Sequence, residues 1–164
     1  MSYTAQDVLI EYIKTNQNRL YKIAYIYTRD SELALDVVQE SITKALENIS
    51  KLRNEEYVKT WFYRILINES LKTIKTNKKL MSCEIDENTL YSNHNEDLVV
   101  ENLDISNCIQ KLNNKLKTVI ILRFFENLKI EEIAIITKTN TSTIKSRLYK
   151  GLNEIKKNYE RNKI

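Results

Sequence analysis

The sequence of 164 residues contains one glycine and no proline. Glycine and proline form most of the tight turns that connect β-strands, so a chain that nearly lacks both has few places for hairpins. Apolar residues make up 42% of the chain and charged residues 29%, which is typical of a globular protein. These features predict an all-α fold.

Long apolar runs are also missing. No stretch of about twenty apolar residues, the length that crosses a bilayer as a helix, occurs in the sequence. The first four residues, Met1, Ser2, Tyr3 and Thr4, lack the basic and then apolar order of a secretory signal. We therefore expect a soluble, cytoplasmic protein without direct membrane insertion.

Residues that commonly bind metals or perform catalysis are scarce. Cys83 and Cys108 are too far apart for a CxxC pair, and His94 is the single histidine. The sequence has no glycine-rich phosphate loop and no recognisable pairing of a nucleophile with a base. We expect no catalytic residues, no metal, no other cofactor and no small-molecule substrate, and we expect both cysteines to be reduced. An enzyme is the class of protein that the sequence favours least.

The net charge of +4 is distributed unevenly. Residues 1–79 carry 13 Lys and Arg against 10 Asp and Glu, residues 80–110 carry none against 7, and residues 111–164 carry 13 against 5. A basic C-terminal part that follows an acidic segment points to a polyanionic partner. A solvated, lysine-rich surface would give the same counts, so charge alone leaves both interpretations open.

The spacing of apolar residues divides the chain into two modules. Helical periodicity extends to about Lys79, is lost in a stretch rich in Asn, Asp, Glu and Ser, and returns near Leu103. We predict two small helical domains, residues 1–79 and 104–164, joined by a flexible acidic linker at 80–103. Within the first domain, residues 28–31 and 50–54 are the expected connections, because Asp, Ser and Asn cap helix starts.

The second expected helix has an apolar side and a polar stripe. Asp36, Gln39 and Glu40 stand at i, i+3 and i+4 on the side opposite the predicted inward residues. By spacing alone, such a stripe is more often a solvated helix surface than a face for docking a protein. The predicted inward residues of this helix are Leu35, Val38, Ile42, Ala45, Leu46 and Ile49.

The third expected helix, from Tyr57 to about Ile74, mixes aromatic side chains with cations such as Arg64. Aromatic rings beside cations suit unstacked bases and phosphates. However, Trp61 also has helical spacing with apolar neighbours, so a place in the core explains it equally well. The residues that we expect to face inward are Trp61, Ile65, Leu71 and Ile74.

Residues 129–148 have the pattern of a helix-turn-helix. Ala134 is small where the two helices would cross, and Ile133, Ile144 and Leu148 fall where their shared core must be filled. The turn has Lys138 where glycine is common, and a left-handed lysine there would cost about 1–2 kcal/mol. A helical hairpin with a lysine-rich face is the alternative. The outward residues that can reach DNA from the second helix are Thr143, Lys145, Ser146, Arg147 and Lys150.

Five segments, in order along the chain, resemble the extracytoplasmic-function (ECF) sigma factors of the sigma-70 family. They are residues 36–40 (DVVQE), 60–65 (TWFYRI) with Asn68, 121–123 (ILR), 131–134 (EEIA) and 143–148 (TIKSRL). Within this group, residues 61–66 (WFYRIL) and 122–126 (LRFFE) are most similar to the sigma-V-like branch. The likeness covers nearly the whole chain.

The resemblance implies an alternative sigma factor that binds core RNA polymerase and promoter DNA. Asp36, Gln39 and Glu40 would dock on the clamp helices of the polymerase. The first domain would read the −10 element, with a pocket for a flipped base and with lysines on phosphates, and the second domain would read the −35 element. The implied −10 residues are Leu52, Arg53, Asn54, Trp61, Arg64, Asn68, Lys72 and Lys75. The implied −35 residues are Thr143, Lys145, Ser146, Arg147 and Lys150.

The branch further implies a membrane-anchored anti-sigma factor that holds the protein inactive until envelope stress. The acidic linker would thread the polymerase channel that later carries RNA, although a merely flexible spacer is an equally good interpretation. One departure from the family is Asn113 after Leu112, where proline is common, but asparagine can still cap the helix. A dimeric regulator with a helix-turn-helix and a helical adaptor that binds only protein are the competing hypotheses.

Overall fold

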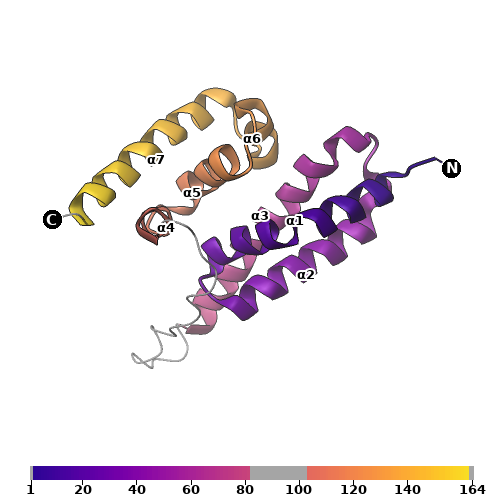
Figure 1. Cartoon of the computed structure of the whole chain (residues 1–164), viewed down its shortest axis with the longest axis horizontal. Coiled ribbons are helices and arrows are strands. Elements are labelled where there is room, and N and C mark those ends of the chain that lie inside the picture. The colour runs from indigo at the N-terminus through magenta and orange to yellow at the C-terminus, as the bar shows by residue number, and fades with distance from the viewer. Residues whose placement is uncertain (1, 82–102, 163–164) are drawn as a thin grey trace. The chain divides into compact units, whose positions relative to one another are not determined.

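The computed structural model describes residues 2–81 and 103–162. In these two ranges every regular element is a helix, which confirms the all-α prediction (Figure 1). The chain divides into two compact units, Met1–Leu98 and Val99–Ile164. Most of the predicted linker at 80–103, including Cys83 and His94, lies outside the described residues. No helix in the described ranges is long and apolar enough to cross a membrane.

The first unit is a bundle of three helices, each of which packs on the other two. They are α1 (Ala5–Thr28), α2 (Ser31–Asn48) and α3 (Val58–Met81), and two short 3₁₀ turns, η1 (Ile49–Lys51) and η2 (Glu55–Tyr57), connect α2 to α3. The core contains fully buried side chains from all three helices. The largest of these are Leu9, Leu20, Ile23, Val37, Phe62, Tyr63 and Leu66.

Side-chain caps begin α1 and α2 in place of glycine and proline turns. Thr4 and Asp7 form a reciprocal capping box at the start of α1. The Asp30 carboxylate accepts a hydrogen bond from the Leu33 backbone N–H, 3.0 Å away, at the start of α2. Between them, Arg29 takes a left-handed conformation, with φ of 55°, that ends α1. The predicted connection at residues 28–31 is therefore confirmed, and Asp30 is its capping residue.

The predicted inward face of α2 is partly wrong. Leu35 and Leu46 are 51% and 39% exposed, whereas Ala34 and Val37 are buried. The buried stripe of α2 is Ala34, Val37, Ser41 and Ala45, and its small side chains let the three helices approach closely. The prediction followed the larger apolar residues, which lie about a quarter of a turn away. Ala45 and Ile49 are buried as predicted.

The inward face predicted for α3 is displaced by one position. Phe62, Tyr63, Leu66 and Ile67 are buried, while the predicted residues Trp61, Ile65, Leu71 and Ile74 are only half-buried. The Tyr12 ring meets the rings of Phe62 and Tyr63 edge to face, with centroids 6.3 and 6.1 Å apart. These two aromatic residues fill the centre of the bundle and leave Trp61 at its edge.

The second unit consists of α4 (Leu103–Gln110), α5 (Asn114–Ile120), the π-helical segment η3 (Ile121–Phe125), α6 (Ile130–Thr137) and α7 (Thr141–Asn162). The Asn113 side chain accepts a hydrogen bond from the Leu116 backbone N–H at 3.0 Å, so it caps α5 as predicted. Helix α7 is the longest element of the unit and packs on α4, α5 and α6 (Figure 1).

The single glycine of the chain lies where α7 crosses α5. A Cβ atom at Gly151 would stand 3.0 Å from Cγ1 of Ile120 and 3.8 Å from Cβ of Leu116. The first distance is shorter than a normal contact between carbon atoms. Gly151 therefore allows the close approach of the two helices.

Candidate nucleic-acid interface

The outer surface of α2 combines carboxylates with apolar side chains. Asp36, Gln39 and Glu40 are all exposed, as the sequence predicts. Because the helix is rotated relative to the prediction, exposed Leu35 and Leu46 lie beside them instead of opposite. The outer surface of α2 therefore presents both charged and apolar side chains. Such a surface suits binding to a protein better than a purely polar surface would.

One face of α3 carries five of the predicted −10 residues. They follow one another at intervals of three or four residues, which keeps their side chains on the same side of the helix. Those nearest the start of α3 are half-buried, and those farther along it are exposed. We call this set the α3 stripe, and it consists of Trp61, Arg64, Asn68, Lys72 and Lys75.

The other three predicted −10 residues lie in the connection that leads into α3. Leu52 is half-buried, whereas Arg53 and Asn54 are exposed. The Asn54 side chain accepts a hydrogen bond from the Glu56 backbone N–H at 3.0 Å and caps η2. The connection is therefore a shaped turn, and it enters α3 at the end that carries Trp61.

A partly buried ion pair joins α2 to α3 next to the α3 stripe. The Lys44 ammonium group on α2 donates a hydrogen bond to the Glu69 carboxylate on α3, and this bond raises the pKa of Lys44 above its usual value. Glu69 is 8% exposed and follows Asn68 directly in sequence. The pair fixes α3 against α2 at the middle of the stripe.

Sequence reasoning did not include Tyr57 among the candidate residues. It is the last residue of η2, directly before α3, and its side chain is 54% exposed at the end of the connection that leads to Trp61. The sequence already indicated Tyr57 as a candidate, because four residues separate it from Trp61, as four residues separate Asn68 from Lys72. Because Phe62 and Tyr63 are buried in the core, half-buried Trp61 is the aromatic residue at the start of this side of α3, next to exposed Tyr57.

The second unit contains the predicted helix-turn-helix. α6 and α7 are joined by residues 138–140, and Ile133, Ala134 and Ile144 are buried between them. Lys138 is left-handed, with φ of 53°, in the position where many such turns have glycine. The Thr139 N–H bonds the Ala134 carbonyl at 3.0 Å, which closes the end of α6.

Asn140 begins the second helix of this motif. Its side-chain oxygen accepts hydrogen bonds from the Thr143 backbone N–H at 2.8 Å and from the Ser142 hydroxyl at 2.9 Å. The first turn of α7 is thereby fixed, with its hydroxyl side chains at the surface. The Ser146 hydroxyl donates to the Ser142 carbonyl within the helix, so only its oxygen lone pairs remain for a partner.

The predicted −35 residues do not all share one face of α7. Thr143, Arg147 and Lys150 follow at intervals of four and three residues, and Ser146 is adjacent to them on the surface. Lys145 is displaced from Arg147 by about 200° around the helix. It lies on the other side of the buried stripe, in line with exposed Tyr149 and Leu152.

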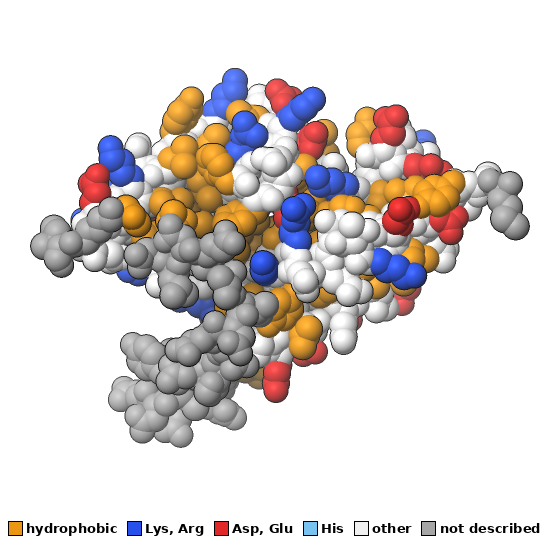
Figure 2. Space-filling view, in the orientation of Figure 1, with side chains coloured by type: hydrophobic (Ala, Val, Ile, Leu, Met, Phe, Trp, Pro, Cys, Tyr) orange, Lys and Arg blue, Asp and Glu red, His pale blue; other side chains and the backbone are white. Residues whose placement is uncertain are grey.

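The distribution of charge does not delimit a site by itself. On the face shown in Figure 2, lysine and arginine side chains are scattered among apolar and polar ones in both units. The position of a residue along its helix is therefore a better guide to a candidate site than the local density of charge.

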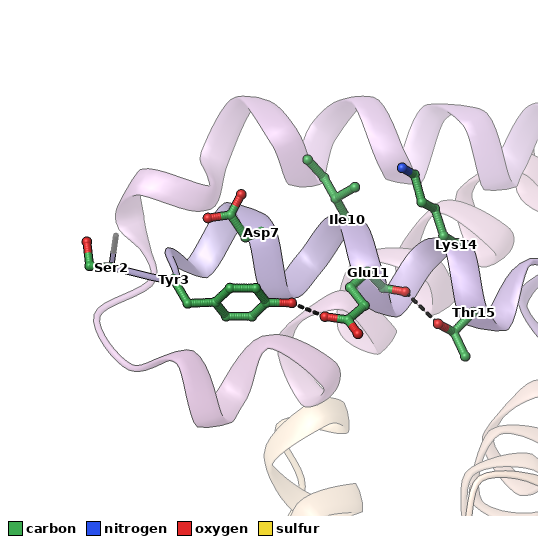
Figure 3. Close-up of a pocket in the computed structure, with 7 residues that line it drawn as sticks. All are labelled: Ser2, Tyr3, Asp7, Ile10, Glu11, Lys14 and Thr15. Carbon is green, nitrogen blue, oxygen red and sulfur yellow. Dashed lines mark hydrogen bonds between the residues drawn. The ribbon is translucent and has the colours of Figure 1, made fainter.

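A shallow hollow near the start of α1 is lined by none of the predicted site residues. Figure 3 shows that its lining comes from the first turns of α1 and the segment before them, and that the Tyr3 hydroxyl donates to Glu11. The Asp7 carboxylate in this hollow accepts from Thr4, 2.6 Å away. In the described ranges no group of three or more His, Cys, Asp or Glu side chains is placed to hold a metal ion.

Comparison with known proteins decides the family. Sigma-70 region 2 matches residues 12–80, and sigma-70 region 4 matches residues 102–155. The chain belongs to the sigma-70 family. It is 38% identical over 149 residues to the RNA polymerase sigma factor SigV of Bacillus subtilis, covering 91% of this chain and 89% of that protein. It is 28% identical to the ECF sigma factor SigW of the same organism, covering 93% and 89% of the two chains.

A solved structure has the same fold. The sigma factor RpoE of Bartonella quintana, crystallised with the anti-sigma factor NepR, matches with a TM-score of 0.76 over 92% of this chain and 95% of that chain, at 18% identity. These relatives confirm the resemblance to ECF sigma factors that the sequence motifs predict. The protein is therefore an alternative sigma factor that directs promoter-specific initiation by RNA polymerase.

Proposed function

We propose that this sigma factor uses three separate surfaces during initiation. The outer surface of α2 binds the clamp helices of core RNA polymerase, the α3 stripe with the preceding connection binds the −10 element, and the helix-turn-helix reads the −35 element. We assign these roles to the domains at 1–79 and 104–164. The observation that carries the proposal is the alignment of Trp61, Arg64, Asn68, Lys72 and Lys75 along one face of α3.

The α3 stripe has the chemistry of a site for unpaired DNA. It changes from aromatic and amide side chains at one end to lysines at the other, over about 21 Å between Trp61 and Lys75. Stacking on an aromatic ring contributes about 1–3 kcal/mol per base, and lysines neutralise the phosphates that follow. Extracting a base from the duplex costs a few kcal/mol, which a shaped pocket at residues 52–54 and Asn68 offsets.

The α2 surface fits a polymerase surface that is both basic and apolar. Exposed Leu35 and Leu46 supply apolar contact area, and Asp36 and Glu40 supply negative charge beside it. Protein interfaces commonly have an apolar centre and a polar rim. Charge complementarity at such a rim mainly increases the rate and specificity of association.

The start of α7 fits the major groove. The helix-turn-helix places the N-terminal residues of its second helix against base edges. Arg147 is the one residue of the proposed −35 set whose planar side chain can bind guanine through two parallel hydrogen bonds. Thr143, Ser146 and Lys150 lie around it and can contact other base edges or phosphates, while Lys145 can reach DNA only from the opposite flank of the helix.

We also propose that an anti-sigma factor anchored in the membrane holds the protein inactive in the cytoplasm until envelope stress releases it. Two proteins of similar fold were solved as complexes, RpoE with the anti-sigma factor NepR and CnrH with the cytosolic domain of CnrY. In this proposal the chain itself performs no catalysis and takes no cofactor, because the chemistry belongs to the polymerase.

The decisive experiment reconstitutes the purified chain with bacterial core RNA polymerase and a genomic DNA library. The 5′ ends of transcripts that require the added chain are mapped, and the shared upstream motifs are determined. Asp36→Arg should weaken binding to core polymerase, measured without DNA. Asn68→Ala should reduce transcription and preference at the −10 motif with core binding unchanged. Arg147→Ala should relax preference at one position of the −35 motif by about 1–3 kcal/mol.

The control for Arg147→Ala is Lys156→Ala, which removes a cation from the other flank of the same helix. It should leave the −35 preference as in the wild type. If the chain neither binds core polymerase nor yields new start sites, the proposal fails, and a regulator that binds duplex DNA alone becomes the hypothesis to test.

A further inference from the structure

Helix α7 continues far beyond the part that a helix-turn-helix needs. It extends without a break from Thr141 to Asn162, so its final twelve residues follow Lys150. The distance from Arg147 to Arg161 along the helix is about 21 Å, whereas the major groove is about 12 Å wide. Since the N-terminal turns of such a helix enter the groove, its C-terminal half must leave it and pass the sugar-phosphate backbone.

The packing of α7 fixes which side of this second half faces the DNA. Ile144 and Gly151 are buried against the rest of the unit, and Leu148 and Ile155 continue their line as half-buried residues. Thr143, Arg147 and Lys150 lie on one flank of this buried line. The same intervals of three and four residues extend that flank to Glu154, Lys157 and Arg161.

The extended flank keeps a net positive charge. Lys157 and Arg161 are exposed, and neither forms a salt bridge with another described residue. Glu154 is the one carboxylate on the flank and is half-buried. The opposite flank is different, because there Tyr149 and Leu152 separate Lys145 from Lys156.

We infer that the C-terminal half of α7 is a second DNA contact, in which Lys157 and Arg161 bind phosphates that flank the −35 element. The inference rests on the proposed function of the helix-turn-helix. Phosphate contacts position a protein on the duplex but carry no sequence information, so these residues strengthen binding equally on all sequences. Each contact releases counterions and makes the affinity more dependent on salt.

The test uses holoenzyme made from the full chain and core polymerase, with promoter fragments carrying the mapped −35 motif. In the variant K157Q/R161Q, promoter affinity near physiological salt should fall roughly tenfold, and the slope of log affinity against log salt should become shallower by about 1–2. Preference among −35 sequences should not change. Lys156→Gln, which removes a charge from the adjacent position on the other flank, should leave both quantities as in the wild type.

Two further measurements locate the contact and test its sign. Shortening the duplex beyond the −35 element, one base pair at a time from the upstream end, should abolish the difference between the wild type and K157Q/R161Q once the flanking phosphates are gone. Glu154→Gln, which removes the carboxylate from the flank, should have the opposite effect and strengthen binding with a steeper salt slope.

The outcomes separate this inference from the proposed function. If wild-type holoenzyme shows no dependence on a −35 motif, the proposed function fails. If it does depend on that motif but K157Q/R161Q behaves like Lys156→Gln, the second half of α7 is only a solvated surface and the inference is overturned. A change in −35 sequence preference in K157Q/R161Q would also overturn it, because it would place these side chains on base edges.

Discussion

The two units present their proposed DNA-binding residues in different ways. In the first unit the α3 stripe lies along the side of a helix that is held by two others, and the position of each residue depends on the packing of the whole bundle. In the second unit the corresponding residues stand at the start of α7, where a turn of three residues and one asparagine cap fix them. The packing of the core therefore positions the proposed DNA-binding residues of the first unit, whereas local backbone geometry positions those of the second unit.

This difference suits the proposed ligands. An unpaired strand is flexible and can follow a long row of side chains, so a stripe on the side of a helix is sufficient. A duplex groove is rigid and narrow, so a helix end must be presented at a defined angle. Variants that act on the core, on the helix crossing and on the turn should therefore affect the two units differently.

The largest effect should come from truncating the core of the first unit. Phe62 is fully buried, and Phe62→Ala should reduce the free energy of unfolding of this unit by about 3–5 kcal/mol. Amide hydrogen exchange, measured by mass spectrometry, should show faster exchange in α1, α2 and α3, with α5 to α7 unchanged. Tyr149→Ala is the control, since this side chain is 69% exposed. Equal loss of protection in both units would show that they are not independent.

A smaller effect is expected at the crossing of α5 and α7. Gly151→Val should destabilise the second unit by about 1–3 kcal/mol, because its side chain would collide with Ile120. The angle at which α7 leaves the unit should change as well, so −35 binding should weaken in the fraction that remains folded. Asn153→Val, at an exposed position of the same helix, should cost less than 1 kcal/mol in thermal unfolding. Similar costs for both variants would contradict the close approach.

The turn of the helix-turn-helix should gain stability from glycine. Lys138→Gly removes the penalty of a left-handed side chain and should stabilise the second unit by about 1 kcal/mol, measured by denaturant unfolding. Lys156 lies at an exposed position inside α7, so Lys156→Gly should instead destabilise the unit by about 1 kcal/mol. A destabilising Lys138→Gly would mean that the lysine side chain makes a contact that outweighs the backbone penalty.

The smallest effect concerns the capping box of α1. Hydrogen bonds from the Thr4 side chain and backbone hold the pKa of Asp7 below its usual value. The folded state is therefore stabilised by ionised Asp7 above the usual carboxyl pKa, and this contribution is lost as the pH falls through the lowered value. Thr4→Ala should move the Asp7 pKa upward in an NMR titration, whereas Thr4→Ser should preserve it.

The sequence was most informative where the signal was local. The helix-turn-helix was predictable because Ala134, Ile133 and Ile144 have fixed places in a short motif, and the capping roles of Asp30 and Asn113 follow from residue type alone. The orientation of α2 was not predictable in this way. Which side of that helix is buried depends on its fit against two other helices, and there the small residue Ala34 is buried while Leu35 is exposed.

The candidate site was predictable to a similar extent. The family resemblance named the residues of the α3 stripe, but only the burial of Phe62 and Tyr63 shows that Trp61 lies at the edge of the core. Lys145 and Arg147 are close in sequence, and a list of outward residues does not reveal that they lie on opposite flanks of α7. Lys157 and Arg161 belong to no short motif. Their place on the same flank as Arg147 follows only from the line of buried residues along α7.

The place of Trp61 also gives the protein an intrinsic optical reporter. It is the only tryptophan in the chain, and it lies half-buried at the head of the α3 stripe. Its emission should therefore respond to base stacking during promoter opening without an attached dye. An attached label would disturb this surface, whereas the indole is already part of it, so a change in Trp61 emission on promoter binding would report on the proposed −10 surface directly.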